Sequence, residues 1–193
     1  TLACKIGETL KLDQEQIARA ADICKCDLVT NMVGEFSDLQ GIMGKYYASL
    51  DGEANDVCLS MDEIYMPRFA GDSLPTSNIG LVLAIAERID TLVGIFGIGQ
   101  IPTGAKDPFA LRRASLGVLR LISEKRLDLS LDTLIQISIA TFESITLSET
   151  TGDDLLAFFS ARSNAMYQDK GFSTPVIKAV QAVNVLKPTD FED

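Results

Sequence analysis

Carboxylates are the groups most able to do chemistry in the first third of the chain. Six of them fall between residues 35 and 63, namely Glu35, Asp38, Glu53, Asp56, Asp62 and Glu63. If they converged, they could bind a metal ion or act as a general acid and base. The chain has no histidine, and their spacing is typical of solvated helix faces. Serine, cysteine and lysine nucleophiles likewise lack a base partner. We therefore expect no catalytic residue.

The cysteines Cys4, Cys24, Cys26 and Cys58 could form disulfides, bind a metal or simply pack. A Cys-x-Cys pair on a helix directs its two thiols about 200° apart, which is poor geometry for one metal ion. Since there is no histidine and no second paired motif, we expect no metal site. Reduced, structural cysteines in a cytoplasmic protein are the better interpretation.

One short stretch of the chain is basic although the whole chain carries a net charge of −10. Residues 106–126, the basic segment, hold 6 basic and 2 acidic groups, a net charge of +4. The stretches on either side are acidic, with net charges of −8 over residues 1–105 and −6 over residues 127–193. The total charge argues against a general nucleic-acid coat, whereas its distribution allows one local contact with an anion.

The arginines of the basic segment share one helical face. At about 100° per residue, Arg112, Arg113 and Arg120 fall within about 100° of arc, and apolar residues occupy the other side. Such a row could follow an RNA backbone, because guanidinium groups bind phosphate oxygens in bidentate fashion. The alternative is pairing with carboxylates, as between Arg120 and Glu124. The candidate RNA-binding residues are Lys106, Arg112, Arg113, Arg120, Lys125 and Arg126.

A run of glycines, Gly94, Gly97 and Gly99, resembles a dinucleotide-binding loop only superficially. Its spacing differs from G-x-G-x-x-G, and it follows an expected helix where that motif requires a strand. Glycines at a helix end that allow a tight exit and close packing are the better interpretation.

Helical periodicity dominates the elements that position these residues. Leu, Ile, Val and Ala supply most of the 47% hydrophobic content, only 7% of residues are aromatic, and no period-two strand pattern occurs. The pattern predicts an all-α fold. No run of about 18 uninterrupted apolar residues suggests a membrane span. We expect helices over residues 13–32, 38–50, 53–66, 79–96, 108–125, 129–145, 153–169 and 174–186. Asp13 is the expected N-cap of the first, and Asp107 with Pro108 the expected start of the fifth.

Long blocks of the sequence resemble the β subunit of bacterial glycyl-tRNA synthetase. These blocks are residues 27–48, residues 65–75 and, most specifically, residues 84–120, with weaker similarity over residues 167–191. The similarity covers nearly the whole chain, which reads as a fragment of a longer protein because it begins without Met. The resemblance implies an HD-like multi-helix bundle over residues 1–150, followed by helices (151–193) that lead toward an anticodon-binding domain.

The resemblance also implies a function and partners. The parent would be an ATP-dependent glycine–tRNA ligase whose α subunit uses ATP and Mg²⁺, so we expect no cofactor in this chain. The expected partners are the tRNA for glycine, the α subunit and the remaining β-subunit domains, in the cytoplasm and without a membrane. The leading expectation is a non-catalytic tRNA-contacting or scaffolding piece. The alternatives are a docking module without RNA contact and a residual HD-type phosphohydrolase with carboxylate-only metal ligands.

Overall fold

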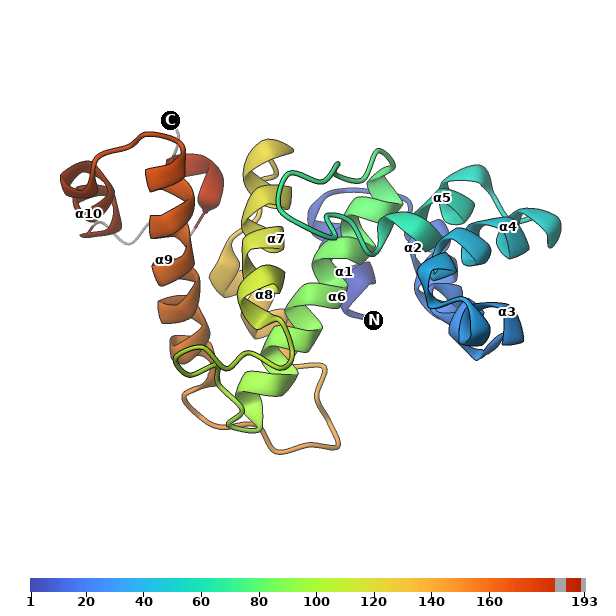
Figure 1. Cartoon of the computed structure of the whole chain (residues 1–193), viewed down its shortest axis with the longest axis horizontal. Coiled ribbons are helices and arrows are strands. Elements are labelled where there is room, and N and C mark those ends of the chain that lie inside the picture. The colour runs from blue at the N-terminus through green and yellow to red at the C-terminus, as the bar shows by residue number, and fades with distance from the viewer. Residues whose placement is uncertain (183–186, 192–193) are drawn as a thin grey trace. The chain divides into compact units, whose positions relative to one another are not determined.

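The computed structural model describes residues 1–182 and 187–191 (Figure 1). Within these residues the chain is helical and contains no β-strand, apart from an isolated bridge between Thr103 and Lys106. The predicted all-α fold is thus confirmed. The chain divides into two compact units, unit 1 (Thr1–Glu87) and unit 2 (Arg88–Asp193). The domain boundary expected between residues 150 and 151 stays a prediction.

Unit 1 is built from short helices. They are α1 (Leu2–Thr9), α2 (Gln14–Ile23), η1 (Cys26–Val29), α3 (Asn31–Glu35), η2 (Ser37–Leu39), α4 (Ile42–Leu50) and α5 (Asn55–Glu63). The expected N-cap of α2 is confirmed, since the carboxylate of Asp13 accepts hydrogen bonds from the backbone N–H groups of Glu15 and Gln16, at 3.0 and 3.3 Å. Helix α4 packs against α5, and α2 packs against both α1 and α5.

The expected continuous helix over residues 13–32 is wrong. Helix α2 ends at Ile23, and the chain then turns through η1 into α3. The turn places Asp27 in the interior, where its carboxylate accepts hydrogen bonds from the backbone N–H groups of Gly41, at 2.7 Å, and Gly44, at 3.2 Å. A carboxylate bound by backbone amides stabilises this turn against helix continuation. Cys24 and Cys26 therefore do not share one helix, and all four cysteines are free thiols.

Helices α4 and α5 are shorter than expected, since α4 begins at Ile42 and not at residue 38, and α5 spans Asn55–Glu63 and not residues 53–66. Helix α4 begins at Ile42 because Gly41 adopts a left-handed conformation, with φ at 79°. A Cβ at Gly41 would lie 2.8 Å from the ring of Tyr65 and 2.9 Å from the carbonyl oxygen of Met61. Only glycine fits this close approach and this φ.

Helix α6 (Asn78–Gly97) matches its prediction closely. Its side chains are buried over most of the circumference, with Val82, Ile85, Ile89 and Leu92 fully inaccessible to solvent. A helix apolar nearly all round is expected in a protein interior. Among the residues that the structure describes, no helix is both long and apolar enough to cross a membrane.

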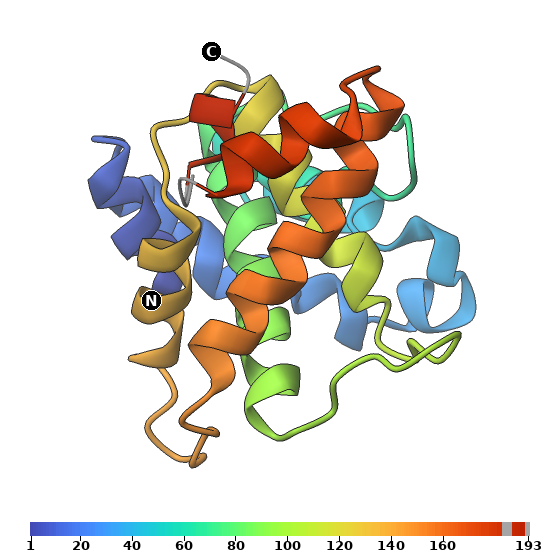
Figure 2. The ribbon, with the colours of Figure 1, turned by 90° about the vertical axis from the view of Figure 1, so that its left-hand side faces the viewer.

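The described residues of unit 2 contain the end of α6 and four further α-helices. They are α7 (Leu111–Glu124), α8 (Leu131–Ile139), α9 (Thr151–Asp169) and α10 (Thr174–Ala182), followed by η3 (Pro188–Phe191). Helices α7 and α9 pack against each other, side by side in Figure 1 and with α9 in front of α7 in Figure 2. Leu121 of α7 and Phe159 of α9 are both buried. The helix expected over 129–145 ends early, at Ile139, and a loop covers residues 140–150. Residues 183–186 of the last expected helix lie outside the described residues.

Candidate nucleic-acid interface

Asp107 holds the start of α7. Its two carboxylate oxygens accept hydrogen bonds from the backbone N–H groups of Leu111, at 2.8 Å, and Arg112, at 3.0 Å. These are first-turn amides without intrahelical acceptors. The helix does not begin at Pro108 as predicted, because Ala110 adopts a left-handed conformation with φ at 54°. Asp107 thus caps α7 although three residues separate it from the first helical residue, Leu111.

Helix α7 buries part of the predicted apolar face, because Val118, Leu121 and Ile122 are buried while Ala110 and Ala114 are half-buried. Leu111, Val118, Leu121 and Ile122 are fully buried. The basic side chains lie off this face and are exposed or half-buried. The core therefore fixes which side of α7 its arginines present.

Arg112 and Arg120 make side-chain contacts with neighbouring groups of the fold. The guanidinium of Arg112 donates to the carbonyl oxygen of Gly104 at 2.7 Å and lies 4.0 Å from the carboxylate of Asp107. Arg120 Nε donates to Glu124 Oε1 at 2.7 Å, the i,i+4 pair foreseen for this helix. Arg112 therefore holds the loop before α7 against the helix, and Arg120 forms an ion pair on the helix surface.

The other four cations are exposed at the two ends of α7. Lys106 precedes the helix, Arg113 lies in its first turn, and Lys125 and Arg126 follow its end. Within the described part of the chain, no carboxylate lies in ion-pair distance of Arg113 or Lys125. The 14 residues of α7 give a length of about 20 Å. Charges spread over this length could meet several phosphates of one strand.

Arg126 occupies a position where glycine is usually found. Its φ is 50°, and its N–H donates to the carbonyl oxygen of Ser123 at 3.1 Å. The N–H of Leu127 donates to the carbonyl oxygen of Ile122 at 2.9 Å. This pair of bonds is the Schellman motif, whose left-handed residue is most often glycine. An arginine here costs conformational energy that the fold tolerates.

Three carboxylates of the acidic stretch serve the fold of unit 1. Glu53 pairs with Arg19, and Asp62 pairs with Arg68. Glu63 is buried and is the acceptor for the residues just before α6. Its carboxylate accepts from the N–H and hydroxyl of Thr76, at 2.7 and 2.6 Å, and from the N–H of Ser77, at 3.1 Å.

Glu63 acts through Ser77 on the first turn of α6. The Ser77 hydroxyl donates to Glu63 and accepts from the N–H of Gly80 at 2.9 Å. A side chain at Gly80 would overlap Glu63. Burial alone would raise the pKa of Glu63, but hydrogen bonds from Ser77 and Thr76 outweigh it and hold the pKa below its ordinary value of 4.5.

Sequence reasoning missed the roles of Asp27 and Glu63. The partners of Glu63 lie 13 and 14 residues away, and those of Asp27 lie 14 and 17 residues away. A capping residue can be predicted from sequence only when it lies within a few residues of the helix end. Among the described residues, no group of three or more Asp, Glu or Cys side chains is gathered so that it could hold a metal ion.

The glycine run at the end of α6 packs closely, as predicted. A Cβ at Gly94 would lie 3.2 Å from the ring of Phe142, and one at Gly97 would overlap Leu147. Gly99 provides the exit, with φ at 77°. The N–H of Ser148 donates to the carbonyl oxygen of Gly97 at 2.9 Å. The absence of side chains at Gly94 and Gly97 therefore allows the loop over residues 140–150 to pack against the end of α6.

Comparison with known proteins gives one consistent family. The model of the family described as glycyl-tRNA synthetase beta subunit matches residues 1–182. The glycine–tRNA ligase beta subunit of Salmonella typhi is 50% identical over 191 residues, which is 99% of this chain and 28% of that protein. The beta subunit of Pseudoalteromonas atlantica is 53% identical over 98% of this chain and 28% of that protein. The chain thus spans about 28% of the length of these relatives.

Proposed function

This chain belongs to the glycyl-tRNA synthetase beta subunit family, and we propose that it contacts the tRNA for glycine as a non-catalytic part of a longer subunit. In this proposal the attachment of glycine, with its ATP and Mg²⁺, takes place on the α subunit in the cytoplasm. The present chain, together with the remaining β-subunit domains, binds and positions the tRNA. The names of the relatives state that they are beta subunits of a glycine–tRNA ligase.

The observation that carries the proposal is the set of exposed cations on and beside α7. Lys106, Arg113, Lys125 and Arg126 are exposed in a segment whose net charge is +4, within a chain of net charge −10. Basic groups that bind phosphates release condensed counterions, which supplies affinity and makes binding depend on salt. Arg112 and Arg120 are half-buried and tied to neighbouring groups. Because Lys106, Arg113, Lys125 and Arg126 are the more exposed cations, we assign the main phosphate contacts to them.

The test is tRNA binding by the full-length chain assembled with its partner subunit. We expect Arg113→Ala combined with Lys125→Ala to weaken binding and to reduce the slope of log K against log salt by about one per lost contact. Lys5→Ala combined with Lys45→Ala is the matched control, since both lysines are exposed and lie in unit 1. If the variant and the control show the same affinity and the same salt slope as the parent, the basic segment is not the RNA contact.

A second candidate function, protein docking without RNA contact, is favoured by exposed apolar side chains in unit 1. Ile42, Tyr46 and Leu50 recur every fourth residue of α4, and their exposed fractions are 39%, 61% and 83%. Residues at this spacing share one helical face. Contiguous exposed apolar surface marks protein interaction sites in soluble proteins.

Substitution of Tyr46 and Leu50 by serine separates the two candidates. A docking role for this face predicts weaker association with the partner subunit by sedimentation, while tRNA affinity of the assembled enzyme stays unchanged per complex. Unaltered sedimentation of this variant would remove docking through α4 from consideration.

A further inference from the structure

Phe109 is an exposed aromatic side chain inside the basic segment. Its exposed fraction is 43%, and its ring makes no aromatic or cation–π pair with the residues that the structure describes. Lys106 precedes it and Arg113 follows it, and both of these cations are exposed. Because a backbone spans at most about 3.6 Å per residue, the Cα of Phe109 lies within about 11 Å of that of Lys106 and about 14 Å of that of Arg113. One strand of RNA could therefore meet the ring and both cations.

The loop before α7, which carries this ring, is fixed by its own hydrogen bonds. Thr103 and Lys106 each donate a backbone N–H to the carbonyl oxygen of the other, at 3.2 and 2.9 Å. The carbonyl oxygen of Gly104 accepts from the guanidinium of Arg112 at 2.7 Å, and Asp107 caps the helix that follows. A ring on a loop that is already ordered loses little conformational entropy when a ligand binds.

Ala110 turns the chain directly after Phe109. Its φ is 54° and its ψ is 35°, a left-handed conformation that is unfavourable for a residue with a Cβ. Unfavourable backbone conformations of this kind occur often at ligand-binding sites. The next residue, Leu111, is fully buried. The left-handed residue therefore lies between a side chain that anchors the helix in the core and a ring that is left exposed to solvent.

Local charge distinguishes Phe109 from the other exposed phenylalanines. Among the described residues, Phe36, Phe69 and Phe172 are also exposed, at 58%, 62% and 39%, but they lie outside the basic segment. The net charge of +4 in that segment attracts phosphates. Proteins that bind single-stranded RNA combine such a basic surface with aromatic side chains on which unpaired bases stack.

We propose that Phe109 stacks on an unpaired base of the bound tRNA, while Lys106 and Arg113 bind phosphates of the same strand. This inference rests on the proposed function and deepens it, because it assigns a single-stranded part of the tRNA to this loop. The bases of a duplex are stacked on one another, so only an unpaired nucleotide can offer its face to the ring. Stacking involves no charge, so it adds affinity without adding salt dependence.

The experiment measures binding of the tRNA for glycine to the full-length chain assembled with its partner subunit, at several salt concentrations. We expect Phe109→Ala to weaken binding about fivefold to a hundredfold, with an unchanged salt slope because no cation is lost. Phe109→Leu keeps apolar bulk without a ring face, and a similar loss is expected. Phe109→Trp keeps a stacking surface and is expected to bind within about threefold of the parent. Phe69→Ala is the matched control, since Phe69 is an exposed phenylalanine of unit 1.

The outcomes separate this inference from the proposed function. If Arg113→Ala combined with Lys125→Ala weakens binding and Phe109→Ala binds like the Phe69→Ala control, the stacking is wrong and the RNA contact of the basic segment stands. If neither variant alters binding, both are wrong. The stacking is also overturned if Phe109→Leu binds as tightly as the parent. Loss of subunit association in sedimentation by Phe109→Ala, with unchanged tRNA affinity per complex, would make the ring a protein contact instead.

Discussion

Unit 1 and the basic segment of unit 2 use charged side chains in opposite ways. In unit 1, Glu63 and Asp27 are buried and accept hydrogen bonds from backbone N–H groups of distant residues. In the basic segment, Arg113 and Lys125 are exposed and make no ion pair with described residues. Glu63 and Asp27 thus hold the fold of unit 1 together, whereas Arg113 and Lys125 remain available for a ligand.

The difference shows that charge density alone does not identify a functional surface. The acidic stretch of unit 1 is rich in carboxylates, yet Glu53 and Asp62 form ion pairs and Glu63 accepts hydrogen bonds from residues before α6. A buried charge is tolerated because hydrogen bonds compensate for lost hydration. An exposed charge without a partner contributes little to stability.

The largest effect is expected for Glu63→Ala. The substitution leaves the N–H groups of Thr76 and Ser77 without their acceptor and opens space beside Gly80. We expect the free energy of unfolding to fall by about 3 kcal/mol, as for other losses of a buried hydrogen-bonded charge. Urea unfolding followed by circular dichroism measures it. Glu35→Ala, at an exposed carboxylate, should cost less than about 0.5 kcal/mol. Equal losses in the two variants would contradict the structural role of Glu63.

A pH dependence follows from the same carboxylate. Because the folded pKa of Glu63 lies below its ordinary value of 4.5, the folded state binds its proton less readily than the unfolded state. The stabilisation is complete above pH 4.5 and is lost as the pH falls through the lowered pKa. We expect the unfolding free energy to decline in this acidic range, and Glu63→Gln to make the decline shallower. An unchanged slope in this variant would assign the acid sensitivity to other groups.

A smaller effect is expected at the start of α7. Asp107→Ala removes the acceptor for the N–H groups of Leu111 and Arg112, which is expected to cost about 1 kcal/mol of stability. Because the carboxylate also lies near the Arg112 guanidinium, the loop before α7 should loosen, which amide exchange at Leu111 would detect. Asp107→Asn keeps an acceptor oxygen and is expected to retain most of the stability. A full loss in the asparagine variant would mean that charge, not capping, is decisive.

The smallest effect, and one of opposite sign, is expected for Arg126→Gly. Glycine removes the left-handed strain of roughly 1–2 kcal/mol from the folded state. It also increases the conformational entropy of the unfolded state, which lowers stability by about 0.5–1 kcal/mol. We therefore expect a gain of about 0.5 kcal/mol in thermal or urea unfolding, together with weaker tRNA binding. Arg126→Ala separates the two terms, because it removes the charge and keeps the strain. If Arg126→Gly also left tRNA affinity unchanged, this residue would have no part in the contact.

The elements that could be predicted from the sequence are those with local determinants. Helix α6 has an apolar pattern over 20 residues, and Asp13 caps α2 through the adjacent amides. The start of α7 was misplaced because Ala110, which carries no turn signal, takes the left-handed conformation. The early end of α2 depends on Asp27 and its contact with Gly41, which no local pattern encodes.

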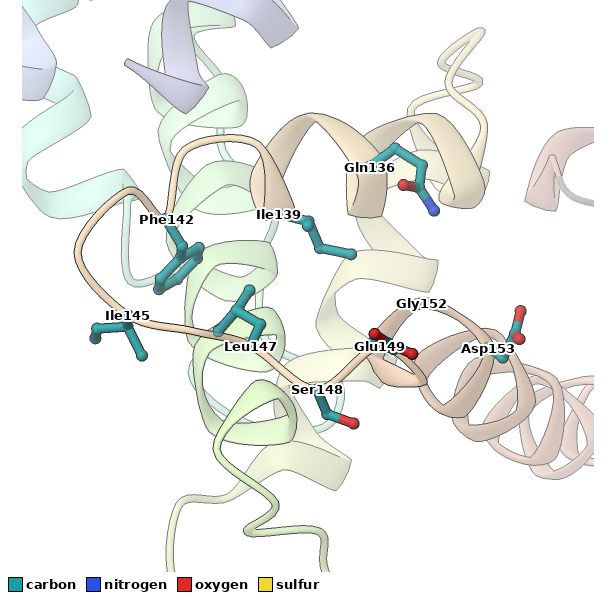
Figure 3. A pocket seen from close by; sticks show the side chains of 9 residues that line it. All are labelled: Gln136, Ile139, Phe142, Ile145, Leu147, Ser148, Glu149, Gly152 and Asp153. Atoms are coloured by element: carbon teal, nitrogen blue, oxygen red, sulfur yellow. The ribbon is translucent and has the colours of Figure 1, made fainter.

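The candidate site could be predicted in part for the same reason. Helical geometry gave the buried face of α7 and the possible pair of Arg120 with Glu124. It did not show that Arg112 reaches back to Gly104, because that contact depends on the path of a loop. The cavity of about 370 Å³ beside Ile145 (Figure 3) could not be predicted from the sequence either, because it forms only where the loop over residues 140–150 packs on the glycines of α6.

The contact of Asp27 with Gly41 and Gly44 has a consequence for the kinetics of local opening. Amides at the start of a helix have no intrahelical acceptor and normally exchange with solvent quickly. Here the two N–H groups are bound to a buried carboxylate that closes a loop of 14 to 17 residues without a covalent link. Their protons can exchange only when α4 separates from η1. Their exchange rates would therefore report how often this noncovalent ring opens in the native protein.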